Sequence, residues 1–173
     1  MSDADRKVAV ITGGSQGIGA GLVAAYRARG WAVVANSLKI EPSRDPDVLT
    51  VAGDVSEPAT ARAIIDAALD RFGHVDSLVN NAGVFMSKPF TDYTAADYAL
   101  ITGVNLGGFF WLTQLAITEM LRRGRGHVVN ISATVAARAV AGSETSPATV
   151  ATSGSSAGLI VSELATTAQP RWR

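Results

Sequence analysis

Lys7 to Gly19 reads KVAVITGGSQGIG, and this stretch decides the fold. An apolar run at residues 8–12 leads into a glycine loop and then into a helical pattern, which is typical of a phosphate cradle, because backbone N–H groups and a helix N-terminus together favour an anion. Gly13 can take a positive φ in the turn, Gly17 lets a pyrophosphate approach the backbone, and Gly19 lets the helix press against the strand. A dinucleotide is the candidate ligand, although a glycine cluster alone is equally consistent with a tight turn.

The composition bounds the class of protein. The chain has 173 residues, with 15 Lys and Arg against 15 Asp and Glu, and no Cys. This length supports one sizeable core, and the balanced charge gives no indication of nucleic-acid binding or of a polybasic membrane contact. The absence of Cys excludes disulfides and thiol catalysis. Residues 1–6 show no secretory pattern and no apolar run reaches the length that spans a bilayer, so we expect a cytoplasmic protein without a membrane partner.

Apolar runs alternate with helical patterns along the chain. Strands are expected at residues 8–12, 31–36, 48–52, 77–79 and 127–131. One helix is expected after the first strand, one after the third, and two, at 94–104 and 107–123, after the fourth. Ser56 is expected to cap the helix that Gly73 ends, and Thr94 forms a capping box with Asp97. The segment 37–47 carries two prolines and is expected as a loop. The alternation predicts a parallel sheet with right-handed crossovers.

Five motifs in order make the sequence similar to a known family. They are TGGSQGIG at Thr12–Gly19, GDV around Asp54, NNAG at Asn80–Gly83, VNLGG around Asn105, and NIS at Asn130–Ser132. Over roughly residues 7–142 the chain resembles the short-chain dehydrogenase/reductase family. The resemblance implies an α/β fold, a Rossmann-type doubly wound parallel sheet with strand order 3-2-1-4-5, and an NAD(P)-binding domain over residues 1–142.

The resemblance also implies roles for particular residues. The glycines would bind the pyrophosphate, Asp54 and Val55 would hold the adenine, and Asn81, Ala82 and Gly83 would support the nicotinamide side. The full expected cofactor set is Gly13, Ser15, Gln16, Gly17, Ile18, Gly19, Ser37, Lys39, Asp54, Val55, Asn81, Ala82 and Gly83. Asn105 matches the asparagine that holds a water in the family's proton relay. The implied reaction moves a hydride between the nicotinamide and the carbonyl or secondary alcohol carbon of a small molecule.

The choice between NADP and NAD depends on the end of the second strand. An NAD preference usually rests on an acidic side chain there, which binds the ribose hydroxyls. This chain has Asn36 and Ser37 there, with Lys39 two residues on. The absence of a carboxylate favours NADP, while Gln16, at a place where a basic residue would help, weakens that preference. A solvated surface charge is the alternative interpretation of Lys39.

The catalytic residues are where the sequence departs from the family. The family places a tyrosine, and a lysine four residues later, beyond the fifth strand. Here the tyrosines are at 26, 93 and 98 and the lysines at 7, 39 and 88, so this pair is absent. The catalytic serine is also in doubt, because Ala133 occupies its place and the neighbouring Ser132 points to the opposite face of a continuing strand. Thr134 or Ser132 would substitute only with a different turn geometry. His74 and His127 are isolated, so no metal site is expected.

Residues 143–173 form an atypical tail that is rich in Ser, Thr, Ala and Gly, with one short helix expected near 157–168. Such a change of composition indicates a truncation or reading-frame change near Gly142, with the C-terminal part of the family fold missing. The helix 107–123 is apolar almost all round, which predicts a homo-oligomer through this helix. Two functions stay open: an NAD(P)-dependent oxidoreductase, and a catalytically inactive, truncated NAD(P)-binding protein.

Overall fold

The computed structural model describes residues 6–132 of the chain. The tail expected over 143–173, its short helix, and the positions of Ala133 and Thr134 lie outside the described residues. The division at residue 142 therefore stays a prediction.

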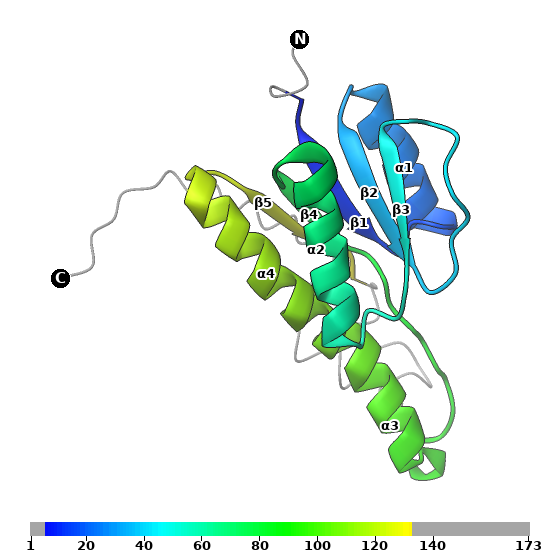
Figure 1. Cartoon of the computed structure of the whole chain (residues 1–173). Helices are drawn as coiled ribbons and strands as arrows, with labels where there is room; N and C mark the ends of the chain where they lie inside the picture. Colours follow the sequence, from blue (N-terminus) through cyan, green and yellow to red (C-terminus); the bar gives the residue numbers. More distant parts are fainter. Residues whose placement is uncertain (1–5, 133–173) are drawn as a thin grey trace, which may run out of the picture.

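A parallel sheet of five strands forms the centre of the molecule (Figure 1). The strands are β1 (Val8–Thr12), β2 (Ala32–Ser37), β3 (Val48–Ala52), β4 (Ser77–Asn80) and β5 (His127–Asn130). Their spatial order is β3-β2-β1-β4-β5, and every pairing is parallel. The predicted strands and the predicted order 3-2-1-4-5 are confirmed. β1 is buried along its whole length, as expected for a strand covered on both faces.

Helices cover the two faces of the sheet. The helices are α1 (Gly17–Ala28), α2 (Pro58–Phe72), η2 (Phe90–Asp92), α3 (Ala95–Thr102), η3 (Gly103–Gly107) and α4 (Gly108–Arg123). On one face, Ile11 and Val33 of the sheet pack with Val23 of α1. On the other, α2 and α4 pack together over the sheet, where Ile64 and Leu112 belong to the same buried cluster (Figure 1). The fold is therefore a three-layer α/β sandwich.

Local signals set most helix ends. Gly30 and Gly73 adopt φ values of 78° and 81° where α1 and α2 end, which only glycine does at little cost. The capping box of Thr94 and Asp97 at the start of α3 is confirmed. The Ser56 cap was wrong: α2 begins at Pro58 after an extended Glu57. Proline at the first helical position has no N–H to satisfy and already has a helical φ, so the helix can start there without a side-chain cap.

α3, η3 and α4 join into one continuous helix, Ala95–Arg123. By length and composition alone, this helix of 29 residues with a mean hydropathy of 1.4 could cross a membrane. The two helices that were predicted separately are each shorter. The core helix of a soluble protein can have the same properties. Leu112, Ala116 and Met120 of α4 lie in the buried cluster, so one side of this helix packs on the α/β core.

The connection from β2 to β3, residues 38–47, contains no helix, as predicted. Parallel strands are usually joined by a crossover of a dozen or more residues with an α-helix in it. This shorter connection leaves β3 half-buried, whereas β2 is buried over most of its length.

Candidate nucleotide-binding site

The expected cofactor residues gather at the carboxyl edge of the sheet. The glycine loop follows β1, Ser37 ends β2, Asp54 follows β3, and Asn81 follows β4. Because all strands are parallel, these four segments lie at the same edge. The chain reverses direction of winding between β1 and β4, and ligands of open α/β sheets bind at such a switch point.

The glycine loop has the conformation predicted for a cradle. Gly13 and Gly17 adopt φ values of 66° and 53°. A Cβ on Gly19 would lie 2.0 Å from the Gly13 carbonyl oxygen, so the helix and the turn are in backbone contact there. Around Gly17, by contrast, a Cβ would meet no described atom within 4 Å. The loop is thus packed tightly on the protein side and open at the position where a pyrophosphate would approach, so its shape fits a dinucleotide.

The N-terminus of α1 is open to an anion. α1 begins at Gly17, and within residues 6–132 the side chain of its N-cap, Gln16, makes no capping hydrogen bond. The first turn carries no acidic residue. The first amides of a helix have no partner within the helix. Those of Gly17, Ile18 and Gly19 are therefore free of a capping side chain and lie at the positive end of the helix dipole.

Asn81 ties the end of β4 to the glycine loop. Its Nδ2 donates to the carbonyl oxygens of Thr12, at 2.9 Å, and Gly13, at 3.3 Å. In return, Thr12 Oγ1 accepts from the backbone N–H of Asn81 at 3.0 Å and of Ala82 at 2.9 Å. The structure therefore brings Asn81 and Ala82 together with the cradle, as expected. Thr12 was missing from the expected site residues, since a threonine at a strand end has no distinctive local pattern.

The Asp54 turn is held by an asparagine that the sequence reasoning did not assign to the site. Asn36 is fully buried, and its Nδ2 donates to the carbonyl oxygens of Val51, at 2.9 Å, and Gly53, at 3.1 Å. Its Oδ1 is buried without a hydrogen-bond partner among the described residues. Asp54 Oδ1 accepts from the Ser56 N–H at 2.9 Å, which closes the turn before α2. Asn36 thus fixes the turn that would hold the adenine.

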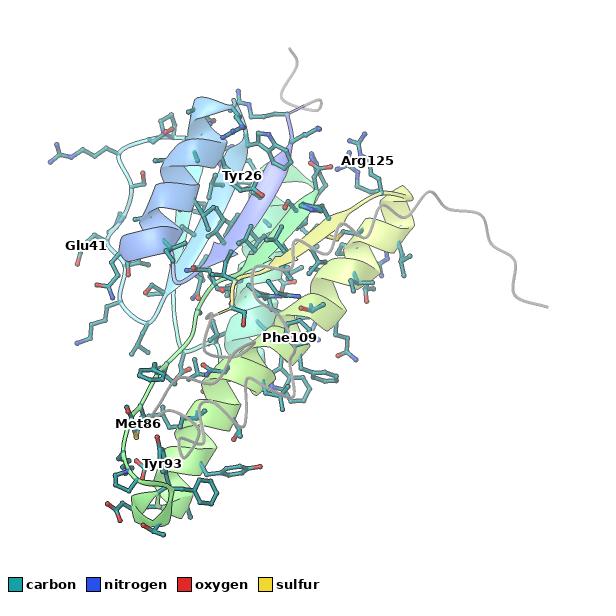
Figure 2. All side chains as sticks on the ribbon, turned by 180° about the vertical axis from the view of Figure 1, so that it is seen from behind. Tyr26, Glu41, Met86, Tyr93, Phe109 and Arg125 are labelled. Carbon is teal, nitrogen blue, oxygen red and sulfur yellow. The ribbon has the colours of Figure 1, made fainter. Side chains whose placement is uncertain are left out.

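Ser15 and Ser37 lie together, with Lys39 near them. Ser15 Oγ donates to Ser37 Oγ at 2.9 Å. Beside them is an open cavity of about 420 Å³, lined by Gly14, Ser15, Val23, Ala35, Lys39, Ile40, Glu41, Ser43, Val48 and Thr50. Glu41 lies on the connection that passes beside α1 (Figure 2). The sequence reasoning considered only the end of β2 and therefore missed this carboxylate.

Asn105 lies in the π-helical turn η3 and clamps the segment after β4. Its Oδ1 accepts from the Val84 N–H at 2.8 Å, and its Nδ2 donates to the Val84 carbonyl oxygen at 3.0 Å. A Cβ on Gly83 would lie 3.4 Å from Asn105 Oδ1, so Gly83 also packs against it. Asn105 therefore positions the backbone that follows Asn81 and Ala82 at the edge of the cradle. π-helical turns are frequent at functional sites.

The remaining candidates for catalysis are Ser132 and the tyrosines of the described residues. Ser132 lies half-buried just after β5, at the same edge of the sheet. Tyr26 is on α1, where its hydroxyl lies 3.3 Å from Ser77 Oγ, and Tyr93 donates to the Met86 carbonyl oxygen. Figure 2 shows Tyr26 and Tyr93 at opposite ends of the molecule. Among the described residues, no group of three or more His, Asp or Glu side chains is arranged to hold a metal ion.

Comparisons with known proteins agree with this architecture. The family model described as short chain dehydrogenase matches residues 7–159. The chain is 37% identical over 138 residues to an L-fucose dehydrogenase of Mus musculus, covering 76% of this chain and 50% of that protein. A short-chain dehydrogenase/reductase structure from Serratia marcescens superposes with a TM-score of 0.76 at 30% identity, covering 86% of this chain and 66% of that one. For the aldohexose dehydrogenase of Thermoplasma acidophilum the TM-score is 0.77 at 27% identity, with 89% and 58% covered.

The matched region is only part of these relatives. The chain spans 50% of the length of the L-fucose dehydrogenase and 66% and 58% of the length of the two solved structures. The family match includes all five strands of the parallel sheet, and the glycine loop, the Asp54 turn and Asn81 lie at one edge of that sheet. The chain therefore belongs to the short-chain dehydrogenase family.

Proposed function

We propose that this chain binds NAD(P) at the carboxyl edge of its sheet and serves as the nucleotide-binding part of an oxidoreductase. The observation that carries this proposal is the contrast within one loop, where Gly19 is packed against Gly13 while Gly17 faces open space. A structural turn needs the tight packing but has no need of the open position. A pyrophosphate needs both, because its oxygens must approach the backbone N–H groups closely.

Three groups of residues around the cradle would each contact one part of the ligand. Gln16, Gly17, Ile18 and Gly19 would face the pyrophosphate, Asp54 and Val55 the adenine, and the segment from Asn81 to Gly83 the nicotinamide side. When bound, the cofactor supplies the hydride that is exchanged with a carbonyl or secondary alcohol carbon of a small molecule. This chain supplies orientation, since Asn36, Asn81 and Asn105 each hold one of the backbone segments through two side-chain hydrogen bonds.

For the cofactor, NADP is the form that we propose. The hydroxyls of Ser15 and Ser37 are 2.9 Å apart, and Lys39 lines the cavity beside Ser15. Two hydroxyl groups and an ammonium suit a ribose phosphate. Glu41 lines the same cavity and opposes this preference, so the margin over NAD is small.

One observation favours a second function, nucleotide binding without turnover. Catalysis of this kind needs a positioned proton donor. The last tyrosine of the sequence is Tyr98 and the last lysine is Lys88, so no tyrosine–lysine pair follows β5 within the 173 residues. Tyr98 is 64% exposed on α3, so its hydroxyl group is not enclosed in a site that would position it as a donor.

We also propose that the chain acts in the cytoplasm and associates with a second copy of itself along α4. The continuous helix exposes Leu106 (61%), Phe109 (37%), Phe110 (48%) and Leu121 (65%). Side chains of this size are uncommon on the surface as a group, and they mark an interface with a protein or with a membrane. The buried side of α4 already packs on α2, which favours a protein partner over a bilayer around the whole helix.

A titration of the folded chain with NADPH and NADH tests the proposal. We expect saturable binding that Gly17→Ala weakens strongly, because its methyl group enters the open position. Gly30→Ala is the matched control, since Gly30 has a φ of 78° and open surroundings at the other end of the same helix. Equal loss in both variants, or no binding of either dinucleotide by the wild type, would refute nucleotide binding.

Turnover is measured separately. Nicotinamide absorbance with ketones and aldoses as substrates distinguishes the two functions. Oxidation of NADPH or NADH by a ketone, or reduction of NADP or NAD by an aldose, supports the oxidoreductase, whereas binding with neither change supports the second function.

A further inference from the structure

One side chain of α1, Arg27, holds the connection between β2 and β3. Its Nε donates to Asp45 Oδ2 at 2.8 Å, and its Nη2 donates to Asp45 Oδ1 at 3.2 Å and Asp47 Oδ2 at 2.8 Å. Its Nη1 donates to the carbonyl oxygen of Trp31, the residue before β2. A guanidinium has a rigid planar fork of donors, so this arrangement fixes the direction of the connection as well as its distance from the helix.

The end of the connection next to β3 is folded around Asp45. The Asp45 N–H donates to Ser43 Oγ at 3.1 Å, and the Asp47 N–H donates to Asp45 Oδ1 at 2.9 Å. The Val48 N–H donates to the Asp45 carbonyl oxygen at 3.0 Å, where β3 begins. The hydrogen bond from Arg27, followed by that from the Asp47 N–H, lowers the pKa of Asp45 below its ordinary value, so this carboxylate is charged at neutral pH. Arg27 therefore acts on an already ordered turn.

The connection also lines the cavity beside the glycine loop, from Lys39 to Ser43. Lys39 and Ile40 of the connection, Ser15 of the glycine loop and Val23 of α1 all contribute to its wall. Val23 and Arg27 are four residues apart and so lie on the same face of α1. One face of this helix thus forms part of the cavity wall and anchors the connection that forms another part of it.

We propose that Arg27 is a positioning residue for nucleotide binding, which holds the connection 38–47 so that Lys39 stays beside Ser15 and Ser37. This inference rests on the proposed NAD(P) site. Because the connection contains no crossover helix, side-chain contacts fix it: the Arg27 hydrogen bonds and the Arg6–Asp47 ion pair hold the end next to β3, and Ile40 packs against the core next to Lys39. If the Arg27 contacts are removed, the position of the connection relative to α1 must be fixed when the ligand binds, and that ordering costs conformational entropy.

The entropy cost would weaken the binding of one part of the ligand. The group at the ribose 2′ position would meet the connection, whereas the 5′-phosphate would meet the glycine loop. Arg27 therefore sets the ratio between the affinities for 2′-phosphorylated and unphosphorylated nucleotides.

The test uses 2′,5′-ADP and 5′-AMP as ligands of the full chain, with dissociation constants measured by calorimetry. For Arg27→Gln we expect the affinity for 2′,5′-ADP to fall about tenfold more than the affinity for 5′-AMP, because a set of charge-assisted bonds is lost. Arg29→Gln is the matched control: it removes the same charge from the same helix, and Arg29 is exposed and donates to Ala25 of its own helix at 3.2 Å. It should change both constants less than about twofold.

A purely structural role would give a different result. Partial unfolding lowers the affinity for both ligands by the same factor, so an unchanged ratio in Arg27→Gln would overturn the proposal. If that variant does not fold by circular dichroism, Asp45→Asn replaces it, because it keeps the arginine and weakens the bidentate pair while the remaining amide oxygen can still accept from the Asp47 N–H. Asp45→Asn should shift the ratio of the affinities for 2′,5′-ADP and 5′-AMP in the same direction as Arg27→Gln. An unchanged ratio in Asp45→Asn would also overturn the proposal. Failure of the proposed function is recognised independently, because the folded wild type would then bind neither nucleotide nor NADPH nor NADH.

Discussion

Alanine at position 19 would place a methyl group where the structure has no room. Its Cβ would lie 2.0 Å from the Gly13 carbonyl oxygen and 2.7 Å from Asn81 Nδ2. Ordinary van der Waals contact begins near 3.4 Å, so the glycine loop or α1 must move by more than 1 Å. Overpacking of this kind costs about 1–3 kcal/mol. The movement also disturbs the hydrogen bonds from Asn81 to Thr12 and Gly13, at about 0.5–1.5 kcal/mol each.

The helix propensity of alanine offsets about 1 kcal/mol of this. We therefore expect Gly19→Ala to lower the free energy of unfolding by about 1–5 kcal/mol, which corresponds to a fall in Tm on the order of 2–20 °C. Gly21→Ala is the matched control, because Gly21 is exposed in the same helix and has no described atom within 4 Å of the added Cβ. It should raise the free energy of unfolding by about 0.5–1 kcal/mol.

Urea unfolding followed by circular dichroism measures both variants, and NADPH titration follows on the folded proteins. Gly19→Ala should lose nucleotide binding and Gly21→Ala should keep it. A Gly19→Ala protein as stable as the wild type, with the same affinity, would show that the contact between α1 and the glycine loop is looser than described here.

Three further predictions concern the helix Ala95–Arg123. Asn105→Ala removes both side-chain bonds to Val84, so it should cost about 1–3 kcal/mol and speed hydrogen exchange at residues 83–86; unchanged exchange would mean that the clamp is unimportant. Hydrogen bonds from Lys88 and then Thr94 lower the pKa of Asp97 to about 2 from 3.8. Its stabilising contribution is therefore complete above pH 3.8 and is lost as the pH falls through about 2, a loss that Asp97→Asn should abolish in acid unfolding curves. Phe110→Glu should convert an oligomer to a monomer in light scattering, whereas an unchanged mass would exclude this face as the interface.

The parts of the fold that local signals determine could be predicted from the sequence. The buried strands, the glycines at positions 30 and 73, and the capping box at Thr94 each depend on neighbouring residues in the chain. The order of the strands came from the family resemblance. The Ser56 cap failed because Pro58 is itself a strong start signal, and the helical pattern was divided at residue 107 because several glycines interrupt its period, although the helix continues through a π-helical turn.

The positions of the residues in the proposed site could be predicted from the sequence only where a motif contains them. The glycine loop, Asp54, Asn81 and Asn105 lie where the motifs indicated. Asn36 and Arg27 were missed, because each acts on groups that are 15 to 20 residues away in the chain and that approach only through strand pairing. A buried asparagine at a strand end and an arginine facing two aspartates were the only sequence signals for them, and both signals are common in unrelated proteins.

The central claim is that the carboxyl edge of the sheet binds an NAD(P) dinucleotide, and amide NMR shifts during a titration with NADPH test it most directly. We predict saturable shift changes at Gly17, Ile18 and Gly19 and around Asp54, with the amino edge of the sheet around Asp76 unaffected. Saturable changes confined to that amino edge, or no saturable change in a folded protein, would contradict the claim.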